Sequence, residues 1–137
     1  MGIKERRQRE IEAVKAAIMK TSRQMAQEKG WPEVSIRKIA KAIEYTPPVI
    51  YEHFKNREAI LIAWEDQGFR ELRYALEEAR SSEKEPVAQL KALTAKIWDW
   101  AFTNRELYEI MFNLEGAKCS PASTKSLWDC GGSVRET

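Results

Sequence analysis

The chain has little of what most enzyme and metal sites require. Its 137 residues include one histidine, two cysteines and six glycines. The two cysteines, Cys119 and Cys130, lie near the end and are not spaced as metal ligands, which favours a disulfide-free cytoplasmic protein. A single histidine without a nearby cysteine excludes the common zinc-binding patterns, and no glycine-rich loop could cradle a phosphate. We therefore expect no catalytic residues, no cofactor and no metal.

Long apolar runs are also missing. The longest, Ala59 to Trp64, has six residues, whereas a membrane-spanning helix needs about 20. The N-terminus is charged and lacks the apolar core of a signal peptide. The sequence therefore predicts no contact with a membrane.

Charge is unevenly distributed along the chain. Up to Arg57 there are 13 lysines and arginines against 7 acidic residues, and after it 10 against 14. This indicates a basic head suited to a polyanion, although chance variation on solvated helix faces is an alternative. Four basic residues precede the first apolar stripe and form either a basic arm or a frayed first turn: Lys4, Arg6, Arg7 and Arg9.

Apolar spacing predicts a first helix that ends at Gly30. Its expected inner face carries Ile11, Val14, Ile18 and Met25. Glycine is the usual residue just past a helix end.

Two short helices are predicted next, over Ser35–Ile43 and Pro47–Phe54. Ser35 caps the first of them. Thr46 should cap the second through its hydroxyl, so that Pro47 and Pro48 occupy the first two helical positions, whose N–H groups have no partner within a helix. Joined by a tight turn at Glu44–Tyr45, the two helices form a helix-turn-helix pattern.

The exposed side chains of this pattern suit DNA. Base edges in a major groove would meet the start of the second short helix, at Thr46, Pro47, Pro48 and Glu52. Phosphates would be bound by Ser35, Arg37, Tyr51, His53, Lys55 and Arg57. The alternative for each of these residues alone is an ordinary solvated surface, but their clustering around one motif favours DNA.

The second half of the chain reads as a helical body. Asn56 should cap a long helix, and Pro86 should open another. The inner face of that second helix should carry Val87, Leu90, Leu93, Ile97 and Ala101. From Lys118 onward no helical periodicity remains.

The run from Ile11 to Leu61 closely resembles the DNA-binding head of TetR-family transcriptional regulators. One departure is Glu44, which stands where members usually have glycine in the turn. The matching residues are Gly30 with an aromatic after it, Val34-Ser35-Ile36-Arg37, Ile39-Ala40, Tyr51, Phe54-Lys55 and Glu58.

The resemblance implies an all-α fold and the same base and phosphate contacts. It implies a three-helix head over residues 1–57 and a partial helical regulatory body over 58–117, and we expect a disordered or aberrant tail over 118–137. Family bodies usually dimerise and bind a small effector. Four residues are candidates for the effector pocket, although they fit a hydrophobic core as well: Trp98, Phe102, Tyr108 and Met111.

We therefore interpret the chain as a sequence-specific DNA-binding transcriptional regulator, a repressor released by a small-molecule effector, with double-stranded DNA as its partner. Family chains are longer, and the helices that usually build their dimer interface would lie beyond the end of this one. With the change of composition at Lys118, this indicates a truncated or frame-shifted product with an incomplete dimer interface. The alternative is a helical interaction module that does not bind DNA and pairs with a full-length relative.

Overall fold

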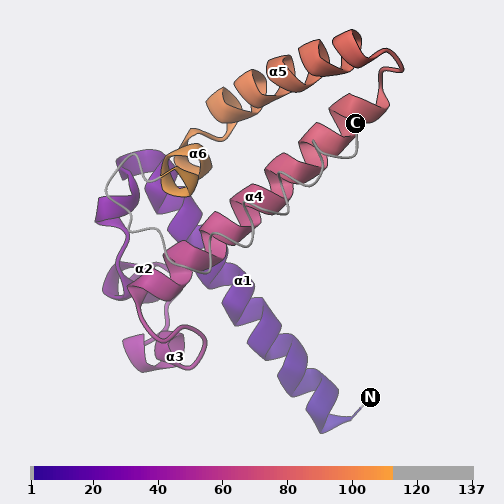
Figure 1. Cartoon of the computed structure of the whole chain (residues 1–137). Coiled ribbons are helices and arrows are strands. Elements are labelled where there is room, and N and C mark those ends of the chain that lie inside the picture. The colour runs from indigo at the N-terminus through magenta and orange to yellow at the C-terminus, as the bar shows by residue number, and fades with distance from the viewer. Residues whose placement is uncertain (1, 113–137) are drawn as a thin grey trace. The chain divides into compact units, whose positions relative to one another are not determined.

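The computed structural model describes residues 2–112, and within this range every regular element is a helix (Figure 1). The predicted all-α fold is confirmed. The chain divides into two compact units, one ending at Leu61 and the other beginning at Ile62. The predicted tail, residues 118–137, lies outside the described residues. None of the described helices combines the length and the apolar content that crossing a membrane requires.

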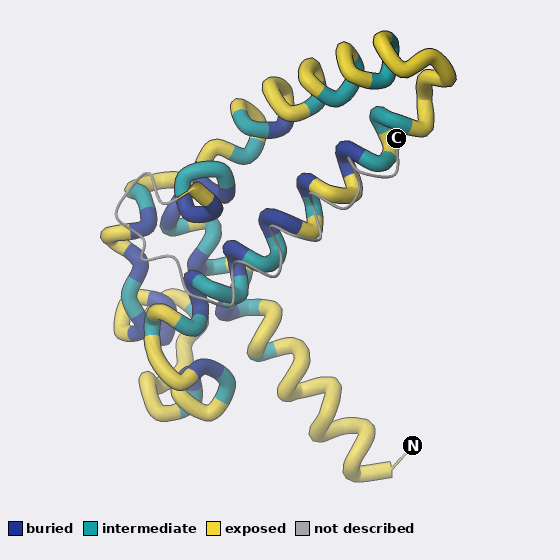
Figure 2. Tube along the Cα trace, viewed as in Figure 1, coloured by how far each residue is buried: buried dark blue, intermediate teal, exposed yellow. Residues whose placement is uncertain are grey.

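The first unit begins with a long helix, α1 (Ile3–Lys29), whose two halves differ in burial. Its buried residues, Ile18, Ser22 and Ala26, follow one another at intervals of four and so share one face. The N-terminal half, residues 2–13, is exposed throughout (Figure 2). The expectation that Ile11 lies on the buried face is therefore wrong: its side chain is 40% exposed, because the packed part of α1 begins later in the sequence.

Gly30 ends α1 in a backbone conformation that other residues avoid. Its φ is 87° and its ψ is 161°, and its N–H donates to the carbonyl of Ala26. This region of backbone space is essentially restricted to glycine. The sequence-based assignment of Gly30 as the stop of the first helix is confirmed.

Replacing Gly30 with alanine is expected to lower the free energy of unfolding by about 1–3 kcal/mol, since the new side chain makes the observed φ and ψ unfavourable. Gly2→Ala is the matched control: Gly2 has a φ of −77°, and a methyl group there would meet nothing within 4 Å. Urea denaturation of both variants measures the difference. Equal free energies of unfolding for the two variants would show that residue 30 does not need the observed φ and ψ to end α1.

Three short helices complete the head. They are the 3-10 helix η1 (Trp31–Glu33), α2 (Ile36–Ala42) and α3 (Pro47–Tyr51). Helix α2 packs against both α1 and α3. The core of this unit consists of large apolar side chains that are at most 7% exposed: Ile18, Trp31, Val34, Ile36, Ile39, Ile50, Phe54 and Ile60.

Helix α4 (Arg57–Ser81) begins in the head and continues into the second unit. The predicted cap is confirmed, because Asn56 Oδ1 accepts a hydrogen bond from the N–H of Ala59 at 2.9 Å. After a turn, α5 (Pro86–Thr103) and α6 (Arg105–Met111) follow. Met111 packs onto α4 at Gly68, where an added methyl group would lie 2.6 Å from the Met111 sulfur. Glycine thus allows the two helices to approach closely.

The predicted inner face of α5 is largely wrong. Val87 and Leu90 are 67% and 65% exposed and Ile97 is 42% exposed, while Leu93 and Ala101 are half-buried. Trp100, which was not assigned to this face, is only 8% exposed. Helix α5 carries large apolar residues on several sides, so apolar spacing alone could not identify the buried one.

Candidate nucleic-acid interface

Helix α2 starts as the sequence predicts. Ser35 has an extended backbone, and its Oγ accepts a hydrogen bond of 3.1 Å from the backbone N–H of Lys38. A serine hydroxyl also has one hydrogen to donate. Ser35 therefore caps α2 and keeps a donor for a phosphate oxygen.

Helix α3 starts at the two prolines, but not through the predicted cap. Thr46 precedes Pro47, and the hydroxyl of Thr46 makes no capping hydrogen bond. Instead, the backbone carbonyl of Thr46 accepts from the N–H of Val49 at 3.1 Å. The expectation about the hydroxyl is therefore wrong, and the hydroxyl is left for other partners. The helix ends at Tyr51, earlier than the predicted Phe54.

The turn between α2 and α3 depends on a residue in a left-handed conformation. Glu44 has a φ of 61°, and within residues 2–112 it is the one non-glycine residue with a positive φ. The N–H of Tyr45 donates back to the carbonyl of Ala40 at 2.9 Å and closes the turn. Glutamate in this conformation costs about 1–2 kcal/mol. The turn thus keeps the geometry that glycine would adopt most easily.

The predicted base-contacting residues are all exposed and lie in α3 or next to its two ends. We call Thr46, Pro47, Pro48 and Glu52, all of them exposed, the recognition surface. Two prolines in the first helical positions leave no N–H groups there. The first two positions of α3 therefore expose no backbone donor, and Glu52 adds an acceptor one turn later.

Five of the six predicted phosphate ligands are exposed or half-buried residues of the same helix-turn-helix motif and the segment after it. Arg37 on α2 and Lys55 after α3 are exposed, Tyr51 is 54% exposed, and Ser35 and His53 are half-buried. They come from both helices of the motif and from the segment after it. Such an arrangement could hold phosphates on more than one side of an inserted helix.

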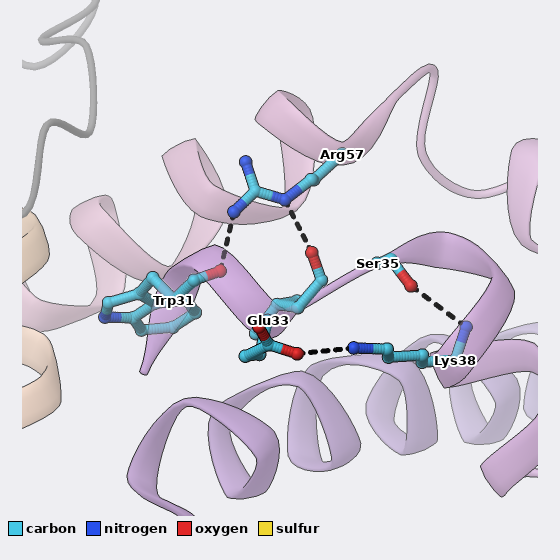
Figure 3. Close-up of polar contacts among 6 residues, drawn as sticks. Trp31, Glu33, Ser35, Lys38 and Arg57 are labelled. Atoms are coloured by element: carbon cyan, nitrogen blue, oxygen red, sulfur yellow. Dashed lines mark hydrogen bonds and ion pairs between the residues drawn. The ribbon is translucent and has the colours of Figure 1, made fainter. Parts of the chain in front are cut away.

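Arg57, the sixth predicted phosphate ligand, forms hydrogen bonds within the head instead (Figure 3). Its Nε donates to the carbonyl of Val34 and its Nη2 to the carbonyl of Trp31, both at 2.6 Å. The side chain is half-buried. A guanidinium fork that spans two carbonyls fixes the segment before α2 to the start of α4. We therefore assign Arg57 a structural role. No local pattern indicated this role, because these partners are 26 and 23 residues away.

Lys38 also forms an ion pair within the head. Its ammonium lies 2.6 Å from the Glu33 carboxylate (Figure 3). The hydrogen bond and the charge of Lys38 hold the pKa of the Glu33 carboxyl below its ordinary value. This pair turns one cation of α2 toward η1, and Arg37 is left as the exposed cation at the start of the helix.

Sequence reasoning singled out Arg7, Ile11 and Val14 of α1 but did not place them beside the helix-turn-helix motif. A hollow of about 470 Å³ is lined from α1 by Arg7, Glu10, Ile11, Ala13, Val14 and Ala17, and from the motif by Tyr45, Val49, Glu52 and His53. In addition, the Lys15 ammonium lies 5.8 Å from the centre of the Phe54 ring. The signal that could have indicated their shared side of the helix is the interval of four residues from Arg7 to Ile11 and again from Ile11 to Lys15.

In the second unit, three of the four candidate effector residues meet. Trp98 and Phe102 of α5 have ring centres 5.1 Å apart, and both line a hollow of about 670 Å³ with Tyr108 of α6. Met111, the fourth, is 2% exposed and packs against Gly68 instead. Arg105 and Glu109, which form an ion pair of 3.1 Å, also line this hollow.

Pro47→Ala and Pro48→Ala are each expected to lower the free energy of unfolding by only about 0.4–1 kcal/mol. Both side chains are exposed and occupy the first two helical positions, so the main effect is the added freedom of the unfolded chain. Urea denaturation measures this change. A loss above about 3 kcal/mol would mean that the prolines have a packing role that their exposure does not indicate.

Comparisons with known proteins agree with this geometry. Residues 18–64 match the family model for bacterial regulatory proteins of the tetR family. A protein of unknown function from Rhodococcus sp. RHA1 has 25% sequence identity and a TM-score of 0.72, and the match covers 88% of this chain and 61% of that one. A bacterial regulatory protein in the tetR family from Rhodococcus RHA1 has 21% identity and a TM-score of 0.71, with 90% and 64% covered. Among curated proteins, none matches. The chain thus spans less than two thirds of the length of these solved structures.

Proposed function

Since this chain belongs, through residues 18–64, to the tetR family of bacterial regulatory proteins, we propose that it is a DNA-binding transcriptional regulator that acts as a repressor. The observation that carries the proposal is the recognition surface itself. Its four residues are exposed, three at the start of a short helix and Glu52 just after its last residue, and the exposed cations Arg37 and Lys55 could hold a duplex against it.

The recognition surface suits close approach to base edges. Pro47 and Pro48 offer apolar contact to thymine methyl groups, and without N–H groups they present no donor that would need a partner. The Glu52 carboxylate could accept a hydrogen bond from the amino group of cytosine. The Thr46 hydroxyl, which does not cap the helix, could donate or accept.

The surrounding residues would set the position of α3 in the groove. The Ser35 hydroxyl and the Arg37 guanidinium would bind phosphates beside α2, and Tyr51, His53 and Lys55 would bind phosphates beside α3. Such contacts carry no sequence information, but they fix the depth and direction of the inserted helix. Arg57 contributes indirectly, because its two hydrogen bonds hold the segment before α2 in place.

Release of the DNA would depend on the second unit. Two heads held about 34–36 Å apart in a dimer would match successive major grooves, and an effector that changes this spacing would prevent both from docking. The hollow lined by Trp98, Phe102 and Tyr108 would suit a mainly apolar effector.

The test is selection of bound duplexes from a random pool, followed by binding measurements at several salt concentrations. Each phosphate contact should add about 0.9 to the slope of log affinity against log salt. Lys55→Ala should reduce the slope by about one and weaken binding to all sequences alike. Lys84→Ala removes an exposed cation outside the head and is the matched control.

Two results would contradict the proposal. An equal slope for Lys55→Ala and Lys84→Ala would remove Lys55 from the phosphate contacts. Failure of the intact chain to select any duplex would favour the alternative function, a helical interaction module that pairs with a longer relative. Sedimentation with such a relative would then show a mixed complex.

A further inference from the structure

The segment that carries the recognition surface has no arginine, lysine, asparagine or glutamine. Residues 43–54, which cover the turn before α3, α3 itself and the residues just after it, contain none of these four types. Arginine and lysine are the usual ligands of guanine, and asparagine and glutamine are those of adenine, because both purines present acceptors in the major groove that need a donor. The segment is therefore poorly equipped to read purines.

Backbone donors are missing from the start of α3 as well. Pro47 and Pro48 have no N–H group, and the N–H of Val49 is bonded to the carbonyl of Thr46. A purine placed against the two prolines would lose water from its acceptors without gaining a donor, and an acceptor left unpaired in this way is unfavourable. The prolines thus select against purines.

The groups that the recognition surface does present fit a pyrimidine. The exposed ring of Pro48 offers an apolar contact for a methyl group at C5. Glu52 follows four residues later with helical φ and ψ of −68° and −27°, so both side chains lie on one side of the helix, one turn apart. Within residues 2–112 the Glu52 carboxylate takes part in no hydrogen bond or ion pair. It is therefore available to accept one from an amino group at C4 of the base.

Thymine and cytosine each match only one of these two features. Thymine has the methyl group at C5 but an acceptor oxygen at C4, which a carboxylate repels, whereas cytosine has the amino group at C4 and only hydrogen at C5. In 5-methylcytosine the methyl and amino groups stand together on neighbouring ring atoms. This modified base therefore matches both Pro48 and Glu52.

We propose that the recognition surface reads pyrimidines through the methyl group at C5, and that 5-methylcytosine is the base that it binds most tightly. Pro48, with Pro47 beside it, contacts the methyl group, and Glu52 accepts a hydrogen bond from the amino group. Methylation of a cytosine in the bound site therefore strengthens binding. The inference rests on the proposed function, since it concerns the same surface and the same DNA.

The test changes one base pair at a time in a labelled duplex that the full chain has selected. At each pyrimidine position, thymine is compared with deoxyuridine opposite adenine, and 5-methylcytosine is compared with cytosine opposite guanine. The two bases of each pair differ only by the methyl group. Burial of one such group should change the affinity about fourfold, which corresponds to about 0.8 kcal/mol.

We expect at least one position at which the methylated base binds about fourfold more tightly in both pairs and 5-methylcytosine binds most tightly of the four bases. Because a methyl group is uncharged, this ratio should stay constant as the salt concentration changes, whereas phosphate contacts weaken with salt. In Glu52→Ala, the methyl ratio should remain and the preference for 5-methylcytosine over thymine should be lost.

Pro47→Ser with Pro48→Ser should bring the methyl ratio close to one, because serine replaces the apolar ring with a small polar group. Pro86→Ser is the matched control, since Pro86 is also exposed and also starts a helix, α5, but lies outside the head. This variant should keep the fourfold ratio. Urea denaturation verifies that both variants are folded.

A methyl ratio near one at every position of the site would overturn the inference, and so would a ratio that the proline double variant retains. Tighter binding of thymine than of 5-methylcytosine at the responsive position would overturn the assignment of Glu52. If no methyl ratio is found but Lys55→Ala still lowers the salt slope, only this inference fails. If the parent protein selects no duplex, the proposed function and the inference fail together.

Discussion

Ile39→Asp is expected to unfold the head. The Ile39 side chain is fully buried on the inner face of α2. Removal of a core isoleucine alone costs about 2–5 kcal/mol, and an unpaired carboxylate in its place adds several kcal/mol. The sum is comparable to the whole free energy of unfolding of a small domain, which is about 5–15 kcal/mol. Circular dichroism and thermal melting measure the loss.

Ala42→Asp is the matched control, because it introduces the same carboxylate at an exposed position of the same helix. We expect it to change the free energy of unfolding by no more than about 1 kcal/mol. If Ile39→Asp yields no soluble protein, Ile39→Ala gives a measurable loss of about 2–5 kcal/mol. An Ile39→Asp variant with unchanged melting would place Ile39 on the surface and refute the assigned orientation of α2.

Arg57→Ala is expected to lower the free energy of unfolding of the head by about 2–4 kcal/mol. Hydrogen bonds from a charged donor contribute about 1.5–3 kcal/mol each, and the lower end applies here because the side chain is only half-buried. Both bonds, to the carbonyls of Val34 and Trp31, are lost together. Arg57→Lys should recover only part of the loss, since an ammonium cannot reproduce the planar fork. Urea denaturation measures both variants.

A comparison with Lys55 distinguishes a structural arginine from a phosphate-binding lysine. Measured where both variants are folded, Arg57→Ala should leave the salt slope of DNA binding unchanged, whereas Lys55→Ala should reduce it by about one without loss of stability. If Arg57→Ala instead reduces the slope and keeps full stability, Arg57 is a phosphate ligand, as the sequence alone suggested.

Local signals in the head were read correctly because they act over a few residues. Ser35 and Asn56 cap their helices with hydrogen bonds to N–H groups three residues later, and Gly30 ends α1 where its φ is positive. Pro47 and Pro48 open α3 as expected. Residue type and spacing determine each of these features, whatever surrounds them. The error at Thr46 is also local: the backbone carbonyl was available as an acceptor, and the hydroxyl was not needed.

Contacts between residues far apart in the sequence could not be predicted from such local signals. The side chain of Arg57 looked like another exposed cation, and only the folded head brings it to carbonyls 23 and 26 residues earlier. The hollow that Arg7 lines together with Glu52 and His53 likewise exists only in the folded head.

The sequence by itself determined the helical class and the ends of most helices, because periodicity, caps and prolines are properties of short segments. Only the tertiary structure decided which face of each helix is buried. In α5, Trp100 is buried while Val87 and Leu90 are exposed, and in α1 the packed face begins after the position of Ile11. An apolar stripe indicates that a helix can be buried. The neighbouring helices determine which part of the helix and which of its faces are buried, because burial depends on contacts between residues far apart in the chain.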